Sequence, residues 1–286
     1  MTGKVIFIGA GPGAADLITL RGARLLATAD VVLFDALTDP ALRDFAPNAR
    51  WIHVGKRGFA DSTGQAAINA LLVKHAQSAN VVVRLKGGDP SVFGRLEEEL
   101  QAVMAAGMAS EVVPGITAAT AAAASTQRPL TRRGDGRSVS LTTAMTVNGE
   151  LPTYRTADTE VFYMAGKQLA ALSRRLLAAE WPADTPVSVV SRAGWPDQRL
   201  SDHTAATLAQ ASMLHAGRPT LVTVGAGALP VVPKTSAETH TRHGSNPPPT
   251  EDQPQPLKCA MAGATTESAP SPITASFQLH PSEPTS

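Results

Sequence analysis

The sequence predicts an α/β fold made of two α/β subdomains with a cleft between them, followed by a disordered tail. Two observations lead to this prediction. Short apolar runs alternate with helical patterns as far as Gly225, and Pro, Ser and Thr replace this periodicity from about Pro230 onward. Short apolar runs separated by amphipathic helices are typical of a parallel α/β sheet. A segment with so little apolar surface cannot offset its ordering entropy.

The first subdomain, 1–114, contains five predicted strands: KVIFIG, VVLFD, WIHVG, VVVRL and SEVVPG. Two stretches between them, ADLITLRGARLLATA and GQAAINALLVKHAQ, have the periodicity of helices. We therefore expect a mainly parallel sheet. Functional loops of such a sheet lie at the carboxyl ends of its strands.

The second subdomain, 115–232, continues with the predicted strands SVSLTT, TEVFYM, PVSVVS and PTLVTVG. KQLAALSRRLLAAE and HTAATLAQASMLHA are its predicted helices. The junction falls near Pro114 and Gly115, and the tail covers 233–286. His240, His243 and Cys259 lie in that tail as scattered polar residues, so we predict no metal site there.

Composition excludes several classes of function. The chain has 25 basic and 24 acidic residues, so its overall charge attracts neither nucleic acid nor a membrane surface. It has no apolar run long enough to span a bilayer, and its first residues enter a strand pattern without a signal segment. The single cysteine allows no internal disulfide and no Cys-rich metal site. We predict a soluble, cytoplasmic protein without a metal.

The loop GAGPGAAD follows the first strand and fits a dinucleotide-binding pattern. Gly9, Gly11 and Ala14 match G-x-G-x-x-G/A, and Asp30 follows at a suitable distance. One hypothesis is therefore an NAD-dependent oxidoreductase. It leaves KGGDP and VVPGIT, at the ends of two later strands, unexplained.

Other strand ends carry polar or glycine-rich groups. The adjacent glycines of KGGDP let a ligand approach the backbone, and Asp89 supplies hydrogen-bond acceptors. Asp35 ends the strand VVLFD, where it could bind a ribose, act as a base or cap the following turn. Because these strand ends meet at one edge of the sheet, they define a cleft.

Basic residues cluster around the same strand ends. In a nearly neutral protein this clustering predicts a cleft for a ligand with several carboxylates or phosphates. Aromatic residues are scarce nearby, which argues against a platform for single-stranded nucleic acid. The basic residues concerned are Lys56, Arg57, Arg84, Lys86, Arg95, Arg128, Arg132, Arg133 and Arg137.

Several motifs, in this order, resemble those of the tetrapyrrole methyltransferases: VIFIGAGPG, ITLRGARLLATADVVLFDAL, VGKRG, INALL, VVRLKGGDPSVFGR and VVPGITAATAAAA. PLT, VFYMAG, TPVSVV, DQR and LVTVG extend the resemblance from about Gly3 to Val232. It implies the tetrapyrrole methylase fold, a homodimer, and S-adenosylmethionine as methyl donor. The implied reaction methylates uroporphyrinogen III at C2 and C7, giving precorrin-2 for sirohaem and cobalamin biosynthesis. This polycarboxylate macrocycle is the kind of ligand that the basic cluster predicts.

The resemblance also assigns roles to residues of this chain. It places the proton acceptor at Asp35 and the proton donor at Lys56. The implied contacts with S-adenosylmethionine are Pro12, Gly87, Gly88, Asp89, Val92, Thr117, Ala118, Met164, Ala193 and Thr220. Without the resemblance, Val92 and Met164 would be interpreted as ordinary core residues.

Three segments depart from the family pattern. Ala14 stands where the family usually has Asp, GRLEEEL replaces GRGGEEL, and RRGDGRS replaces HRDYAQS. The donor motifs therefore match better than the acceptor motifs. Three alternatives stay open: methylation of another corrinoid such as precorrin-4 at C11, a non-catalytic module that binds S-adenosylmethionine or a tetrapyrrole, and a methylase for RNA or a modified histidine.

Overall fold

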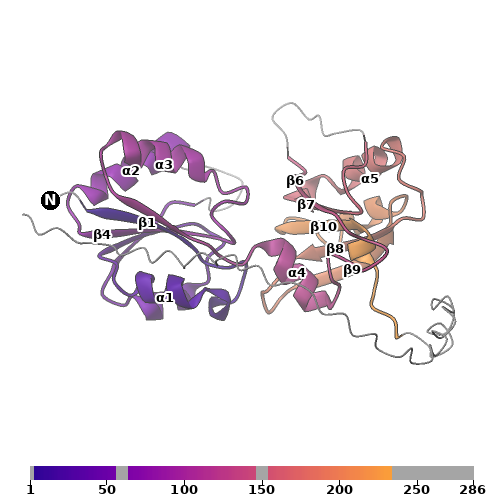
Figure 1. Cartoon of the computed structure of the whole chain (residues 1–286), viewed down its shortest axis with the longest axis horizontal. Helices are drawn as coiled ribbons and strands as arrows, with labels where there is room; N and C mark the ends of the chain where they lie inside the picture. Colours follow the sequence, from indigo (N-terminus) through magenta and orange to yellow (C-terminus); the bar gives the residue numbers. More distant parts are fainter. Residues whose placement is uncertain (1–2, 56–63, 146–153, 234–286) are drawn as a thin grey trace, which may run out of the picture. The chain divides into compact units, whose positions relative to one another are not determined.

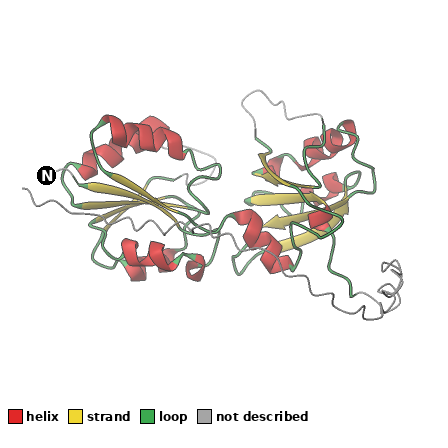
Figure 2. Cartoon of the chain, viewed as in Figure 1, coloured by secondary structure: helices red, strands yellow, loops and turns green. Residues whose placement is uncertain are grey.

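The computed structural model of the protein describes residues 3–55, 64–145 and 154–233. Two five-stranded sheets with helices packed on them form this part of the chain (Figures 1 and 2). The prediction of two α/β assemblies is thereby confirmed. The predicted tail, except for Pro233, lies outside the described residues.

Every strand pairing in the first sheet is parallel, as the buried apolar runs predict. Its spatial order is β3-β2-β4-β1-β5. The strands are β1 (Lys4–Gly9), β2 (Val31–Phe34), β3 (Arg50–His53), β4 (Val81–Lys86) and β5 (Ser110–Val113). The carboxyl ends of β1, β2 and β4 therefore lie side by side, which brings together Gly9, Asp35 and Gly87.

Helices cover both faces of this sheet (Figure 1). Phe7 and Leu33 pack toward α2 (Gln65–Ala76) and α3 (Leu96–Ala105). Ile8 and Val32 point to the opposite face, which α1 (Leu20–Leu26) and the 3₁₀ helix η2 (Pro40–Phe45) cover. Successive strand residues alternate between the two clusters, so the sheet has a core on each face.

Two predictions in this half need correction. The expected single helix over 15–29 is two elements, a 3₁₀ turn η1 (Ala15–Leu17) and α1. The break occurs at Thr19, whose side chain accepts a hydrogen bond from the Gly22 N–H at 3.1 Å and so caps α1. Helix α3 was also not predicted, because the three glutamates of its first turn make its apolar periodicity hard to recognise.

The second sheet is mixed, with the order β6-β7-β10-β8-β9. The β6 and β7 strands are parallel, and the other pairings are antiparallel. The strands are β6 (Val139–Thr143), β7 (Thr159–Tyr163), β8 (Pro186–Ser191), β9 (Arg199–Thr204) and β10 (Thr220–Gly225). One core cluster joins this sheet to α5 (Leu169–Ala178), and a second cluster joins it to α4 (Ala118–Thr126).

The helix predicted over 203–216 is wrong. Its first two residues belong to β9, and only a 3₁₀ helix, η4 (Leu208–Ser212), follows. The β9 strand was not predicted, because it is an edge strand with a polar sequence, RLSDHT, and none of its residues is fully buried. The division into 1–114 and 115–232 stays a prediction, since residues 1–233 form one compact unit.

In the described ranges, no helix combines the length and the apolar character that crossing a membrane requires.

Candidate functional site

A largely apolar cavity is lined by residues from both sheets. Eight of the ten predicted donor contacts line it: Pro12, Gly87, Gly88, Thr117, Ala118, Met164, Ala193 and Thr220. Leu37, Phe93, Tyr163, Val190, Arg192, Trp195, Pro219 and Leu221 complete the lining. An apolar cavity with a few polar groups is the usual form of a small-molecule site. We call it the donor cavity.

The remaining two predicted contacts, Asp89 and Val92, do not line the donor cavity. The Asp89 carboxylate accepts hydrogen bonds from the backbone N–H groups of Ser91 at 2.8 Å and Gly115 at 2.9 Å. Val92 packs against the core cluster that joins the second sheet to α4. In this structure Asp89 therefore ties two loops together, and Val92 is part of the apolar packing.

Three glycines meet beside the donor cavity: Gly9 at the end of β1, Gly88 after β4 and Gly115 after β5. A Cβ atom at Gly9 would lie 2.5 Å from the Cα of Gly115 and 2.7 Å from the carbonyl oxygen of Gly88. A Cβ atom at Gly115 would lie 2.3 Å from that same oxygen. We call these residues the glycine crossing. The glycine at position 9 is thus explained by contact between backbones, without a pyrophosphate ligand.

Backbone strain is concentrated around the donor cavity. Three of its lining residues, Phe93, Met164 and Arg192, have φ values of 53°, 56° and 52°. Non-glycine residues rarely adopt this left-handed region, and residues that do so often lie at functional sites. The strain is therefore a second, independent indication that this cavity is a site.

The Tyr163 side chain, which sequence analysis missed, supports the start of α4. Its hydroxyl forms a 2.7 Å hydrogen bond with the Thr117 hydroxyl and accepts the Ala119 N–H at 3.3 Å. Burial raises the pKa of Tyr163 above its usual value, so the phenol stays neutral. Tyr163 thereby fixes Thr117 and Ala118 at the wall of the donor cavity.

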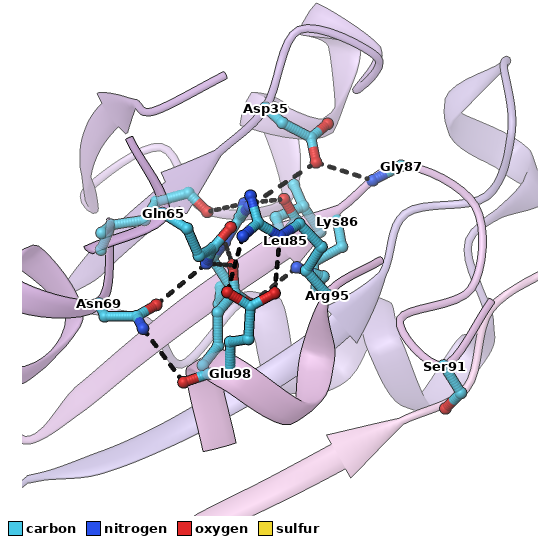
Figure 3. Close-up of polar contacts among 12 residues, drawn as sticks. Asp35, Gln65, Asn69, Leu85, Lys86, Gly87, Ser91, Arg95 and Glu98 are labelled. Carbon is cyan, nitrogen blue, oxygen red and sulfur yellow. Dashed lines mark hydrogen bonds and ion pairs between the residues drawn. The ribbon is translucent and has the colours of Figure 1, made fainter. Parts of the chain in front are cut away.

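Asp35 lies in a second, more polar pocket that shares Leu37, Gly87 and Phe93 with the donor cavity. Its carboxylate accepts the backbone N–H of Leu37 at 3.3 Å. It also accepts the backbone N–H of Gly87 at 3.3 Å (Figure 3). The Asp35 side chain is 25% exposed. An oriented, accessible carboxylate beside the donor cavity is well placed to accept a proton.

Three buried charges lie next to Asp35. Glu99 is fully buried, and its two oxygens contact Arg84 Nε at 3.1 Å and Lys86 Nζ at 2.7 Å. Arg84 Nη2 also lies 3.8 Å from an Asp35 oxygen. Burial is the main cause that lowers the pKa of Lys86, and the neighbouring Arg84 adds to the effect. Glu99 was not predicted, although its place in GRLEEEL was noted.

Part of the predicted basic cluster lines the polar pocket of Asp35, namely Arg84, Lys86 and Arg95. Arg84 and Lys86 also share the buried Glu99, whereas Arg128 pairs with Asp202 and lines neither pocket. Arg132 donates to the carbonyl groups of Ala226 and Leu229. Arg95 forms an ion pair with Glu98 in the same helix region, and Arg133 and Arg137 are exposed. Lys56 and Arg57 lie outside the described residues.

The unusual Ala14 has no side chain that could cap η1. Its backbone N–H donates to the Gly194 carbonyl at 2.9 Å. The Asp39 carboxylate accepts the Ala15 N–H at 3.1 Å and the Ala41 N–H at 2.9 Å, so it caps both η1 and η2. A side chain from another element thus supplies the cap that position 14 lacks.

Comparison with known proteins agrees with this geometry. Residues 4–209 match the family model described as Tetrapyrrole (Corrin/Porphyrin) Methylases. A uroporphyrinogen-III C-methyltransferase of Pseudomonas aeruginosa is 43% identical over 203 residues, which cover 70% of this chain and 83% of that protein. A siroheme synthase of Baumannia cicadellinicola is 45% identical over 233 residues, 78% of this chain. This match covers 50% of the synthase, so the chain spans about half the length of that relative.

Solved structures are similar as well. A uroporphyrin-III C-methyltransferase from Thermus thermophilus has a TM-score of 0.68 and 37% identity, covering 81% of this chain and 99% of that one. A Thermus thermophilus enzyme of the same name, complexed with S-adenyl homocysteine, matches at 34% identity and a TM-score of 0.68, covering 78% and 97% of the two chains. A cobalt precorrin-4 methyltransferase matches at 28% identity and a TM-score of 0.69, covering 79% and 96%. With two sheets arranged as in these enzymes and a family match over most of its length, this chain is a member of the tetrapyrrole methylase family.

Proposed function

We propose that the protein transfers methyl groups from S-adenosylmethionine to C2 and C7 of uroporphyrinogen III, giving precorrin-2 for sirohaem and cobalamin biosynthesis. The observation that carries the proposal is the position of Asp35, in a polar pocket that shares three residues with the donor cavity. The relative from Pseudomonas aeruginosa, at 43% identity, bears the name of this activity. The Thermus thermophilus structure with S-adenyl homocysteine supports the donor.

The donor cavity fits a nucleoside with an amino-acid side chain. Gly88 has a φ of +75°, and a Cβ atom placed on it would meet nothing closer than the Ile116 carbonyl at 4.0 Å. Its backbone is therefore accessible to a ligand, and Gly87, Ala118 and Ala193 add small residues to the same wall. Apolar surface from Phe93, Val190 and Leu221 would cover an aromatic base. S-adenosylmethionine supplies an activated methyl group when it is bound.

The protein's own contribution is position and proton transfer. A pyrrole carbon must meet the methyl group in line, and an apolar cavity keeps water out of that path. Asp35 then accepts the proton that the methylated macrocycle loses, since its carboxylate is oriented by two backbone N–H groups. Lys56 remains the proposed proton donor, and its role rests on the sequence resemblance alone.

The decisive experiment supplies purified protein with uroporphyrinogen III and S-adenosylmethionine without oxygen. The expected product is dimethylated, identified by mass and absorbance. Binding of S-adenosylhomocysteine without any methylated product would overturn the proposal and favour a non-catalytic module.

Precorrin-4 is the second acceptor to test, because a cobalt precorrin-4 methyltransferase shares the fold at 28% identity. The same assay with that substrate should yield no product. Methylation of the precorrin alone would identify the acceptor as a later intermediate of corrinoid synthesis.

The proposal includes a cytoplasmic homodimer that binds no nucleic acid. Light scattering after gel filtration should give twice the mass of one chain, 29.7 kDa. The further activities of the longer siroheme synthases are not proposed, because the chain covers only about half of them.

A further inference from the structure

The segment 192–198, which follows β8, contacts the opening glycine loop of the first sheet. The Trp195 indole N–H donates to the Pro12 carbonyl at 3.0 Å. The Ala14 N–H donates to the Gly194 carbonyl at 2.9 Å. A Cβ atom at Gly13 would lie only 2.4 Å from that carbonyl, so the two backbones touch. These contacts join parts of the chain that are more than 170 residues apart in sequence.

The Trp195 ring is itself held in place. The Arg192 guanidinium lies 4.3 Å from the ring centroid, and its Nε donates to Asp197 at 2.7 Å. Arg218, from the approach to β10, donates to the same Asp197 carboxylate at 2.9 Å. The segment that contacts Pro12 is thus also held by Arg192, which follows β8, and by Arg218, which precedes β10. A donor held in this way loses little conformational freedom when its hydrogen bond forms.

Trp195 and Pro12 both line the donor cavity, although they come from different sheets. Pro12 lacks an N–H group, so its carbonyl is the only backbone group through which the loop can be held at that residue. The Trp195 N–H donates to this carbonyl. None of the sequence motifs indicated this, because the two residues lie 183 positions apart.

We propose that Trp195 is a positioning residue that holds the glycine loop 9–16 through the Pro12 carbonyl and so keeps the donor cavity in the shape that binds the donor. We call this contact the clamp. The proposal rests on the proposed function for the identity of the donor. Trp195 acts through Pro12, beside the Gly194 carbonyl that holds Ala14, and it takes no part in methyl transfer. Its loss therefore weakens donor binding more than it slows the chemical step at saturating donor.

Trp195→Phe is the direct test, because it removes the indole N–H and retains an aromatic ring. Trp51→Phe is a matched control. Trp51 also donates its indole N–H to a backbone carbonyl, that of Ala46, at 3.0 Å, and also carries an arginine, Arg43, over its ring. Trp51 lies in β3 and does not line the donor cavity.

Calorimetry should show S-adenosylhomocysteine bound about three- to tenfold more weakly by Trp195→Phe than by the wild type, the effect of one lost hydrogen bond. Trp51→Phe should bind as the wild type does, although both variants lower the melting temperature to a similar degree. Equal affinity in Trp195→Phe, or an equal loss in Trp51→Phe, would overturn the clamp.

Hydrogen exchange at the Ala14 amide tests the clamp without any ligand. Exchange should be faster in Trp195→Phe than in Trp51→Phe, and faster still in Gly13→Ala, where the new methyl group pushes against Gly194. Unchanged Ala14 exchange in Trp195→Phe would also overturn the clamp. If the wild type fails to bind S-adenosylhomocysteine, the proposed donor is wrong, and Ala14 exchange still decides the role of Trp195.

Discussion

Both oxygens of the Asp35 carboxylate accept a backbone N–H, one from Leu37 and one from Gly87. Asp35→Asn keeps the shape of the side chain and removes its capacity to accept a proton. We expect kcat to fall by about a hundredfold or more, within the range of general base catalysis. The affinity for S-adenosylhomocysteine should change less than about twofold.

Steady-state assays and calorimetry measure the two effects of Asp35→Asn separately. Asp44→Asn, at an exposed carboxylate of the same half, serves as the control. If Asp35→Asn retained wild-type kcat, Asp35 would have no place in the mechanism.

Protonation of the buried His215 side chain lowers the stability of the fold. This side chain is fully buried between the hydroxyls of Ser191 and Ser201. Burial, with smaller effects from His203, Arg218 and Arg199, lowers the pKa of His215 to about 4. Since the unfolded chain takes up this proton near pH 6.5 and the folded chain does not, stability falls as the pH drops below about 6.5.

We therefore expect the free energy of unfolding to fall by about 2 kcal/mol from this residue between pH 8 and pH 5. Urea unfolding at both pH values measures it, and His215→Gln should remove that part of the pH dependence. The same pH dependence in His215→Gln would assign the effect to other groups.

Single residues also show what sequence could and could not predict about the site. Eight predicted donor contacts line one cavity. Five of them follow the parallel strands β1, β4 and β5, whose carboxyl ends converge, and the other three belong to the mixed second sheet. Tyr163 and Trp195 were not predicted because their partners lie 46 and 183 positions away in sequence and only folding brings them together. The sequence also did not show that Arg84 and Arg128 have the carboxylate partners Glu99 and Asp202.

At the scale of elements, β4 and α3 are joined by the contacts of Glu99 with Arg84 and Lys86. Glu99→Gln leaves two cations buried without their shared anion. We expect it to lower the free energy of unfolding by about 3 kcal/mol, as for other broken buried ion pairs. Denaturant unfolding measures this, with Glu97→Gln, at an exposed residue of the same helix turn, as control. Equal stability of the two variants would contradict the structural role of Glu99.

Elements with strong apolar periodicity were predicted well, and those without it were not. The strands β1, β4, β8 and β10 are buried along almost their whole length, so their sequences are rich in apolar, mostly β-branched residues. The edge strand β9 has no such run, and its last two residues were included in a predicted helix. Thr19 divides the first helical pattern by capping the start of α1, which the apolar spacing does not reveal.

At the scale of the whole chain, the family match ends at residue 209 and the cavity residues end at Leu221. A chain shortened to 1–233 should therefore keep its affinity for S-adenosylhomocysteine and its kcat within about twofold, since it retains every described residue that lines the donor cavity. Calorimetry and the methylation assay compare it with the full chain. A large loss of kcat with folding intact would give 234–286 a functional role.

The glycine crossing has a consequence for how this protein can evolve. Position 9 is blocked by the backbone of Gly115 and Gly88, and position 115 is blocked by the backbone of Gly9 and Gly88. A methyl group at either position meets main chain, which cannot be trimmed by mutating a neighbour. No change of a neighbouring side chain can then relieve the clash. The sequences of the loops after β1, β4 and β5 can therefore vary only where the contact among these three glycines is kept.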